Sequence, residues 1–527
     1  MFSVGWTKPV AGLRLTSKVS QTMVNAFVRS LLAALSGGLV VLCHPDPGWG
    51  WLAWLALVPL VYAVYGATGA VSVLIGAVFG LISSVGTLRW IFVIDAFNLL
   101  HAMILSAYLS VFFVAWCIIA ARLSRSHWMI FALGAPSAWI LLDYLRGHAG
   151  FLSAPWATLA HTQAEYPVVL QVADVTGEYG VSWLIVLVNL GVAGWLLRTP
   201  NHRKVTWFTA GIMLAVLTYG IAELRYPAGQ KTLHVAIVQP AFTTAELHRV
   251  RDPRGRYARL LQLTREAATT RPDLVVWPES ALPNVGSNSK IRNRLLRLAR
   301  DLDTRLLVGS SAIEKFRSPN GQDETRSRFR NQAFLIDLSQ PAAPPYDKQL
   351  LVPFGEYVPL ARLVTWPQFI LSEPFHTIAG DGFRIFELDR GILISPFICW
   401  ESVFSDLFRP AIRAGARLIV QLTNDNWFGL TGQPRQHNAA SVLRSVEYRV
   451  PTVIASNTGP SAIYDDRGRR LSGPTPLFEE AWLSHTVTLG RGISFYARHG
   501  DIFLAVSALG FIVLLVASRF TTSNTSD

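Results

Sequence analysis

The sequence predicts a membrane bundle of about eight helical spans joined to one α/β domain. Three observations lead to this prediction. The chain has 527 residues, of which 51% are hydrophobic and only 15% are charged. Its mean hydropathy is +0.33, and from residue 233 onward long apolar runs give way to short strand-like runs. Soluble domains of ordinary composition are more polar than this, so part of the chain must lie in lipid.

Eight apolar runs approach the length of about 20 residues that a helix needs to cross a bilayer core. They cover residues 26–43, 50–66, 69–88, 102–121, 128–144, 182–198, 205–223 and 502–518. We therefore expect a membrane domain at 1–225 with seven spans, an α/β domain at 226–500, and a final span and tail at 501–527.

The first apolar run has some features of a cleaved signal sequence. Basic residues precede it, and it ends in "LVVLC" at Cys43. Leu42 is large, however, where a processing site has a small residue, and further spans follow at once. We expect the run to be retained as a membrane anchor.

Basic residues in short loops predict the orientation of the spans. They cluster before the first span and after the fourth, sixth and last spans: Lys8, Arg14, Lys18, Arg122, Arg125, Arg198, Arg203, Lys204 and Arg519. With eight spans all four clusters fall on one side, which should be the cytoplasm, with both ends of the chain there. The α/β domain then lies on the opposite face, which in a bacterium is the periplasm.

The net charge of +13 does not by itself indicate a nucleic-acid partner. Much of the excess lies in loops expected beside anionic lipid headgroups. No zinc finger, RNA-binding signature or repeat of basic and aromatic residues accompanies it. The sequence also shows no metal-ligand spacing, phosphate-binding glycine loop or nucleotide motif. We expect neither a nucleic-acid partner nor a cofactor.

Short runs rich in Val, Ile and Leu predict the strands of the α/β domain. Several are apolar at consecutive positions, as strands buried on both faces are. Helical spacing between them predicts helices, and this alternation fits a single α/β domain. The strands are expected at 233–239, 273–278, 305–311, 332–338, 391–399, 416–425 and 452–458, and the helices at 254–270, 289–303, 402–414 and 436–449.

Chemically useful side chains follow several of these strands, where ligands bind in α/β sheets. In "VVWPES", Glu279 follows a buried strand; alone it would be an ordinary solvated loop residue. In "YDKQLLVPFGEYVP" (346–359), Lys348 and Glu356 form either a surface salt bridge or a partly dry lysine pocket. In "PFICWE" a strand ends at Cys399, and a helix is expected from about Ser402. A helix N-terminus there would favour the thiolate.

Cys399 is the only one of the three cysteines in the α/β domain, because Cys43 and Cys117 lie in or beside spans. No disulfide within that domain is possible. A buried cysteine alone is more often a small core residue. A carboxylate and a lysine at neighbouring strand ends change this interpretation. Glu279 could take the thiol proton, and Lys348 could stabilise an oxyanion.

His437 could also be interpreted as a catalytic base. No second histidine or metal-ligand spacing accompanies it in the sequence. A local hydrogen bond on its own helix is therefore the expected role.

These motifs, together with "TNDNWFG" (423–429), resemble the nitrilase superfamily of carbon-nitrogen hydrolases. The multi-span frame and three further segments resemble, more closely, the apolipoprotein N-acyltransferases. These segments are "GFLSAPWATLAHTQ" (150–163), "DVTGEYGVSWL" (174–184) and "QHNAASVLRSVEYRVPTVIASNTGPS" (436–461). The resemblance covers nearly the whole chain. It implies a nitrilase-like α-β-β-α sandwich seated on a membrane bundle in the bacterial inner membrane, with the sandwich on the periplasmic side.

The resemblance also implies a reaction. A fatty acyl chain would pass from a membrane phospholipid, through a cysteine thioester, to the α-amine of the N-terminal S-diacylglyceryl-cysteine of an apolipoprotein. Matching positions give Cys399 as nucleophile, Glu279 as general base and Lys348 as electrostatic stabiliser. Glu356 and Glu401 would shape the pocket and support the intermediate. Trp400, where similar proteins commonly have Tyr, is a supporting residue.

The sequence leaves two alternatives open. One is a membrane-tethered nitrilase-type amidase that acts on a small soluble substrate. The other is a non-enzymatic transport or assembly protein, against which the few charges of the spans argue, because they lie mostly near predicted ends. These charges are Arg29, Arg89, Asp95 and Asp143.

Aromatic residues are candidates for a lining or lid of the pocket, which must exclude water from a thioester. Ordinary core packing or anchoring at the membrane interface explains them equally well. They are Phe354, Trp366, Phe369, Phe375, Trp427 and Phe428.

Overall fold

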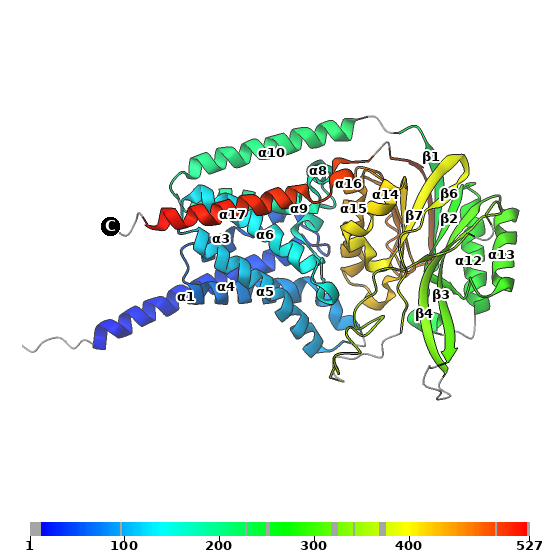
Figure 1. Ribbon diagram of the computed structural model, residues 1–527, viewed down its shortest axis with the longest axis horizontal. Helices are drawn as coiled ribbons and strands as arrows, with labels where there is room; N and C mark the ends of the chain where they lie inside the picture. Colours follow the sequence, from blue (N-terminus) through cyan, green and yellow to red (C-terminus); the bar gives the residue numbers. More distant parts are fainter. Residues whose placement is uncertain are drawn as a thin grey trace, which may run out of the picture.

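The computed structural model places a helical bundle and a two-sheet sandwich end to end (Figure 1). It describes residues 12–94, 97–226, 229–248, 253–317, 325–340, 343–367, 376–490 and 493–523. Four residues named above lie outside these ranges: Lys8, Asp95, Phe369 and Phe375.

Seven helices in the described part of the chain are long and apolar enough to cross a membrane. This confirms a multi-pass membrane bundle. The helices are α1 (Gly12–Cys43, with its apolar part at Met23–Cys43), α4 (Gly69–Thr87), α5 (Leu99–Leu123), α6 (Trp128–Gly147), α9 (Glu178–Leu196), α10 (His202–Arg225) and α17 (Ile502–Ser523, with its apolar part at Ile502–Arg519).

The span predicted at 50–66 is not one continuous helix, which corrects that prediction. It consists of η1 (Gly50–Leu52), α2 (Ala53–Ala56) and α3 (Val58–Val64). Asn189 of α9 bonds the backbone groups that the break frees: it donates to Ala53 O at 2.9 Å and accepts from Leu57 N at 2.8 Å. Irregular backbone is tolerated at membrane depth where protein groups satisfy it in this way.

The broken segment nevertheless runs back along α1. At its start, Trp49 N donates to Leu42 O at 2.9 Å. At its end, the Arg29 guanidinium donates to Ala63 O at 2.5 Å and Tyr65 O at 2.9 Å. The chain therefore returns to the level of Arg29 before α4 begins. Counted with the seven long helices, this broken segment gives eight passes within the described residues, which agrees with the number expected, and α1 starts and α17 ends at the end distant from the sandwich (Figure 1).

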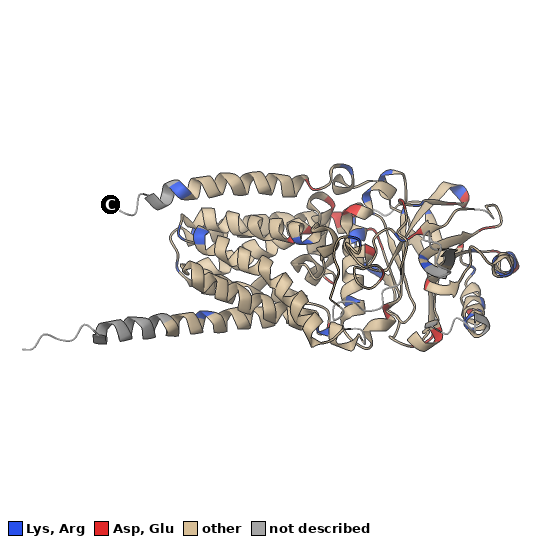
Figure 2. Ribbon diagram, turned by 60° about the horizontal axis from the view of Figure 1, so that its bottom comes forward, with Lys and Arg blue, Asp and Glu red and all other residues tan. Residues whose placement is uncertain are grey.

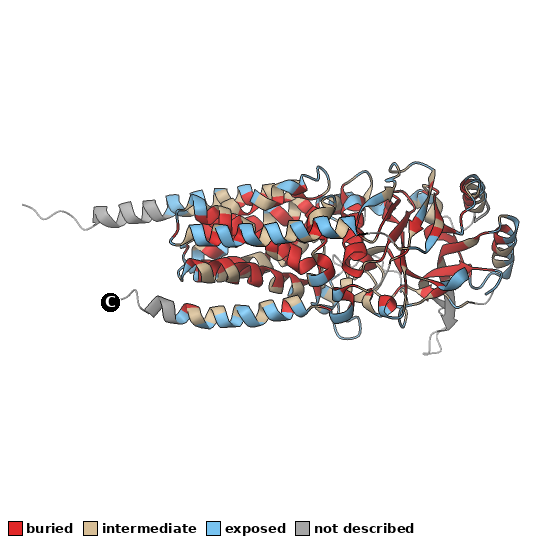
Figure 3. Ribbon diagram, turned by 90° about the horizontal axis from the view of Figure 1, so that it is seen from above, coloured by how far each residue is buried: buried red, intermediate tan, exposed pale blue. Residues whose placement is uncertain are grey.

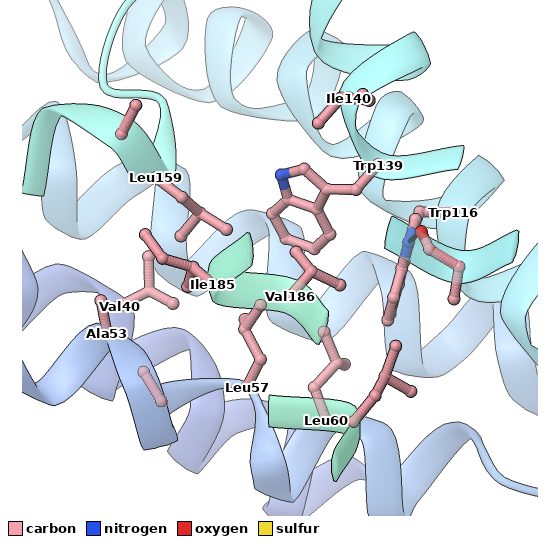
Figure 4. Close-up of a cluster of buried hydrophobic side chains, with 14 of the residues drawn as sticks. Val40, Ala53, Leu57, Leu60, Trp116, Trp139, Ile140, Leu159, Ile185 and Val186 are labelled. Atoms are coloured by element: carbon pink, nitrogen blue, oxygen red, sulfur yellow. Dashed lines mark hydrogen bonds between the residues drawn. The ribbon is translucent and has the colours of Figure 1, made fainter. Parts of the chain in front are cut away.

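Charges are sparse along the bundle and frequent in the sandwich (Figure 2). The outer faces of α1, α10 and α17 are exposed along much of their length (Figure 3). Their exposed side chains include Trp207 and Leu509, which are 77% and 66% exposed. Helices that carry large apolar residues on their outer faces are suited to contact with lipid. Inside the bundle, Leu57, Leu60, Trp116, Trp139, Ile185 and Val186 pack in one apolar cluster (Figure 4).

Within the described residues the sandwich has two six-stranded sheets, which confirms the predicted α-β-β-α fold class. The first has the order β12-β1-β2-β3-β4-β5 and the second β11-β10-β9-β8-β7-β6. The strands are β1 (Thr232–Gln239), β2 (Leu274–Pro283), β3 (Arg305–Arg317), β4 (Thr325–Ile336), β5 (Tyr346–Asp347), β6 (Phe386–Leu388), β7 (Ile392–Ile398), β8 (Leu418–Thr423), β9 (Thr452–Ser456), β10 (Ala462–Tyr464), β11 (Arg470–Ser472) and β12 (Ala481–Thr488).

Helices cover the outer face of each sheet (Figure 1). The first sheet packs on α12 (Pro253–Ala268) and α13 (Ser289–Asp301), and the second on α14 (Arg409–Arg413), α15 (Gln433–Tyr448) and α16 (Phe495–His499). In β1, Val235 and Ile237 lie between the sheets, whereas Ala236 and Val238 pack under the helices. This strand is buried on both faces, as the consecutive apolar residues predicted.

The helix expected at 402–414 is largely absent. The chain instead forms the 3-10 turns η6 (Cys399–Val403) and η7 (Ser405–Leu407) before the short α14. Pro410 near the start of α14 and Gly415 with φ of 108° after its end confine the α-helix to five residues.

Helix α15 joins the sandwich to the bundle through buried charges. Arg444 donates to Glu178 of α9 at 2.8 Å, and Glu178 N donates to Glu447 at 2.8 Å. Near the end of α15, Arg449 donates to Asp174 at 2.8 Å. These bonds fix the helix that lies behind the candidate site. We propose the domain limits 1–225, 226–500 and 501–527, since α10 ends at Arg225 and α17 begins at Ile502.

Candidate active site

Glu279 lies on an irregularity in β2. The parallel pairing of β2 with β3 shifts register between Trp277 and Leu282, and Ser280 has a φ of 54°. Gly309 of β3 makes room for this irregularity, because a Cβ added to it would lie 2.0 Å from Pro278 O. Bulges of this kind turn a side chain away from the regular alternation of a strand.

The Glu279 carboxyl is buried and only half satisfied. Asn331 of β4 donates to its Oε1 at 2.6 Å, and within the described residues Oε2 accepts no hydrogen bond. Burial raises the pKa of Glu279 to about 7; the charge of Glu356 adds to this rise, and the charge of Lys348 opposes it. A carboxyl with this pKa can both take and return a proton near neutral pH.

Lys348 is linked to Glu279 through Asn331 of β4, which bonds both residues. Its backbone N donates to Asn331 O at 2.9 Å, and its side chain is 1% exposed. Its Nζ donates to Glu356 Oε1 at 2.9 Å, and Glu356 Oε2 accepts from Val352 N at 2.7 Å. Of the two interpretations of this segment, the structure shows the dry lysine pocket.

Lys348 keeps its charge in spite of its burial. Burial alone lowers the pKa of the ammonium, but the acidic groups of Glu356, Cys399 and Glu279 raise the pKa above its usual value overall. A fixed positive charge in a dry site is the arrangement that stabilises a developing oxyanion.

Cys399 stands where β7 turns into η6, with a left-handed φ of 56°. Burial raises the pKa of its thiol well above the usual value, and the charge of Glu279 raises it further, against the opposing charge of Lys348. The thiol at rest is therefore neutral, which corrects the expectation of a thiolate at a helix N-terminus. The turn that follows is a short 3-10 helix rather than an α-helix. The charges of Glu279 and Lys348 each affect the pKa of the other and that of the Cys399 thiol, so the three groups form one interacting set.

Glu401 holds this site together from within the core. Its Oε2 accepts from Ile398 N at 2.7 Å and from Tyr346 Oη at 2.8 Å. Its Oε1 accepts from Gln349 N at 2.6 Å and from Leu350 N at 3.1 Å. The carboxylate thus ties the strand end before Cys399 to the loop after Lys348.

Trp400 makes a second link to that loop. Its Nε1 donates to Leu350 O at 2.9 Å, and its ring packs edge-on against Phe404 at 4.9 Å. Glu401 is fully buried, whereas the Trp400 side chain lines a cavity. The two supporting residues therefore have different surroundings. Glu401 is enclosed by the backbone that it positions, whereas Trp400 both bonds the backbone and borders the cavity.

Two adjoining cavities of about 590 and 640 Å³ lie where the sandwich meets the bundle. Both are lined by Gly147 and His148 of the bundle end and by Gln349, Leu350 and Phe404 of the sandwich. Their volumes are typical of sites for small organic ligands. Because Leu350 also bonds Glu401 and Trp400, this space adjoins the loop that carries Lys348.

Comparison with known proteins gives the family. The family model described as apolipoprotein N-acyltransferase N-terminal domain matches residues 36–191, and the model described as carbon-nitrogen hydrolase matches residues 234–496. A protein named apolipoprotein N-acyltransferase from Geobacter metallireducens is 36% identical over 92% of this chain and 94% of its own. The chain belongs to the apolipoprotein N-acyltransferase family. The prediction of an acyltransferase enzyme is thereby confirmed.

More distant members of the apolipoprotein N-acyltransferase family align over similar lengths. A protein of that name from Gloeobacter violaceus is 31% identical over 97% of this chain and 98% of its own. Among solved structures, an amidase from Nesterenkonia sp. aligns with 52% of this chain and 96% of its own, at 18% identity and a TM-score of 0.35.

Two of the candidate aromatic residues, Trp366 and Phe428, contact the bundle. Trp366 packs edge-on against Phe354 at 5.1 Å and against Phe151 of the loop after α6 at 6.2 Å. Phe428 packs edge-on against Trp90 at 5.0 Å. These rings bridge the two parts of this apolipoprotein N-acyltransferase family member.

Sequence reasoning missed three residues around the site. Asn331 bonds both Glu279 and the backbone of Lys348. His437 does not make the expected bond within its helix, because its Nε2 lies 3.0 Å from Cys399 O and its Nδ1 lies 3.0 Å from Asp425 Oδ1. Asp425 is part of the quoted motif "TNDNWFG", which could have indicated it; nothing in the sequence indicated Asn331.

Proposed function

We propose that the protein transfers a fatty acyl chain from a membrane phospholipid, through a thioester on Cys399, to the α-amine of the N-terminal S-diacylglyceryl-cysteine of apolipoproteins. The observation that supports this most is the site itself. It holds a neutral thiol, a carboxyl of pKa about 7 and a buried ammonium ion in one electrostatic group. They can supply the nucleophile, the general base and the oxyanion stabiliser of acyl transfer through a cysteine.

In the first step Glu279 takes the thiol proton, and Cys399 Sγ attacks the ester carbonyl carbon of the phospholipid. The oxyanion that forms faces the Lys348 ammonium. When the tetrahedral intermediate collapses, the ester C–O bond breaks, and the lysophospholipid oxygen takes the proton from Glu279. The acyl chain remains on Cys399 as a thioester, and Glu279 is again ionised.

In the second step the lipoprotein α-amine attacks the thioester carbon, and Glu279 takes a proton from the amine nitrogen. The C–S bond then breaks, Cys399 recovers its proton from Glu279, and a stable amide leaves. Because the acyl-enzyme forms and the lysophospholipid leaves before the amine attacks, ping-pong kinetics are expected.

The bundle explains how both lipid-anchored substrates reach the site. The cavities at the junction are lined by His148 of the bundle and by Gln349 and Leu350, which follow Lys348 in the sandwich. Holding two lipids in a thin layer beside the nucleophile supplies much of the rate. We place the chain in the bacterial inner membrane with the sandwich on the periplasmic side, since the passes put Arg122, Arg198 and Arg519 at the opposite end.

Intact-mass spectrometry of the purified protein supplied with phospholipid tests this proposal. We expect a gain of one fatty-acyl mass that hydroxylamine removes and that a diacylglyceryl lipopeptide discharges as an N-acylated product. Cys399→Ala should lose the adduct. Cys117→Ala is the matched control, because Cys117 is buried in α5 and should leave the adduct unchanged. No adduct on active, lipid-supplied protein would rule out the thioester step.

A further inference from the structure

The buried pair His437 and Asp425 lies directly behind Cys399 and has no part in the mechanism above. His437 comes from α15, and Asp425 begins the turn η8 (Asp425–Phe428) after β8. Both side chains are 1% exposed or less. The ring lies between two acceptors, the Cys399 carbonyl at 3.0 Å from Nε2 and the Asp425 carboxylate at 3.0 Å from Nδ1, and the Gln421 amide nitrogen also lies 3.2 Å from Nε2. A ring between two acceptors donates from both nitrogens when it is protonated.

The carbonyl that His437 binds belongs to one of the residues of the site whose backbone is left-handed. Cys399 has a φ of 56°, a left-handed conformation that is unfavourable for a residue with a side chain. Something must hold it there. Gln421 Nε2 also points at the Cys399 carbonyl, but at 3.5 Å. The shorter and stronger side-chain bond is the one from His437.

This bond fixes more than the carbonyl. The C=O and the following N–H of a planar trans peptide point in opposite directions. Binding of Cys399 O by His437 therefore also sets the direction of the Trp400 N–H. Glu401 fixes the Phe397–Ile398 peptide, two peptide bonds earlier, through Ile398 N at 2.7 Å. Glu401 thus fixes the backbone that precedes the nucleophile, and His437 fixes the peptide that follows it.

The neighbouring residue of α15 ties this arrangement to the bundle. Gln436 Oε1 accepts from Trp156 Nε1 at 2.9 Å and from Trp90 Nε1 at 3.2 Å. Its Nε2 donates to Thr87 O at the end of α4 at 3.1 Å. The Trp156 ring lies 5.7 Å from that of His437. Three contacts from the membrane domain therefore meet one residue away from the histidine.

We propose that His437, oriented by Asp425, is a positioning residue for acyl transfer: it holds the Cys399–Trp400 peptide in the conformation from which Sγ attacks, and Gln436 anchors it to the membrane bundle. The inference rests on the proposed role of Cys399 as nucleophile. The pKa shift of His437 agrees with this role, because a protonated ring can donate from both nitrogens. Burial lowers the pKa of His437, but the charge and hydrogen bond of Asp425, the bond to Cys399 O and the charge of Glu279 raise it overall.

The test compares rates of Cys399 acylation in the full-length protein, measured by intact mass in single turnovers with phospholipid vesicles. His437→Ala should slow acylation about a hundredfold, the loss expected for a small misplacement of a reacting group. The KM for phospholipid should stay unchanged. His437→Gln keeps one N–H donor and should recover a substantial part of the rate. Asp425→Asn removes the charge that orients the ring, and its acylation rate should lie between those of His437→Ala and His437→Gln.

Asn438→Ala is the matched control. Asn438 is the next residue of α15, is buried, and donates to Pro460 O at 2.8 Å rather than to the site. It should lower the melting temperature about as much as His437→Ala and leave acylation within about threefold of wild type. Equal slowing by both variants, or wild-type acylation in His437→Ala, would overturn the inference. If His437→Ala does not fold, the comparison of His437→Gln and Asp425→Asn with Asn438→Ala decides.

Failure of the inference and failure of the proposed function give different results. If wild type forms no acyl adduct, the nucleophilic role of Cys399 fails, and the inference fails with it. If wild type forms the adduct and His437→Ala forms it equally fast, only the positioning role is lost. A Gln436→Ala variant that slows acylation while keeping the melting temperature supports the anchoring to the bundle, and wild-type acylation in that variant removes it.

Discussion

Lys348 Nζ lies 2.9 Å from Glu356 Oε1 in a pair whose lysine is 1% exposed and whose glutamate is 19% exposed. The glutamate can meet water at its outer edge, but the ammonium depends on its protein partners. Loss of the partner of a buried charge is costly even where the intact pair adds little net stability.

Glu356→Ala should therefore destabilise the protein by about 3 kcal/mol and lower activity at least tenfold, because the unpartnered ammonium either loses its proton or shifts. Thermal melting in detergent and single-turnover acylation measure the two effects. Glu246→Ala removes a more exposed partner of Arg259 and should cost no more than about 1 kcal/mol. Equal losses in the two variants would contradict the buried role of Glu356.

The pKa of Glu279, raised by burial to about 7, sets the pH dependence of acylation. The ionised carboxylate is the base, so the rate should rise as pH increases through about 7 and level off above it. At pH 6 about a tenth of the carboxyls are ionised, and the rate should fall accordingly. Glu279→Gln should be inactive at every pH. A flat profile between pH 5.5 and 8.5 in wild type would contradict Glu279 as the base.

The same raised pKa has a consequence for stability. The folded state favours the protonated form of Glu279, so its contribution is fully present below its unfolded pKa and is lost as pH rises through about 7. Glu279→Gln should thus raise the melting temperature relative to wild type more at pH 8 than at pH 5. Melting curves of both proteins at the two pH values give this difference directly.

The sequence allowed the strand ends of the site to be predicted, because strands buried on both faces are marked by consecutive apolar residues. β1 and β7 begin and end within one residue of the predicted runs 233–239 and 391–399. Glu279 and Cys399 stand at the ends of such runs, and the sequence alone therefore predicts that both residues belong to the site. Strand β12 was missed because its exposed and buried residues alternate irregularly.

What could not be predicted depends on groups that meet only after folding. The break within 50–66 is stabilised by Asn189, more than 120 residues away in the chain. His437 reaches Cys399 O from another helix, 38 residues further on. Apolar periodicity contains no information about such polar contacts, because it reports burial and not partners.

Variants of Tyr346 and Glu401 test whether the hydrogen bonds of Glu401 position the segments before Cys399 and after Lys348. Its hydroxyl donates to Glu401 Oε2 at 2.8 Å from β5, deep in the core. Tyr346→Phe removes one of four donors to a buried carboxylate and should cost about 1–3 kcal/mol of stability, with a moderate loss of acylation. Glu401→Gln presents an NH2 group to backbone N–H donors and should lower both quantities further. If the Tyr346 and Glu401 variants melt and acylate like wild type, the link does not position the site.

Gly309 offers the sharpest test of how the fold places Glu279. An alanine Cβ there would lie 2.0 Å from Pro278 O and 2.8 Å from Glu279 Cα, and since both are backbone atoms, the bulge itself must move. Gly309→Ala should reduce acylation by about a hundredfold or more, since a displacement of about 1 Å at a reacting group costs that much. Gly38→Ala in α1 is the control, because its added Cβ would meet nothing within 4 Å. Single-turnover acylation and melting of both variants decide the matter: a Gly309→Ala protein that folds and acylates at the wild-type rate would show that the bulge does not set the position of the base.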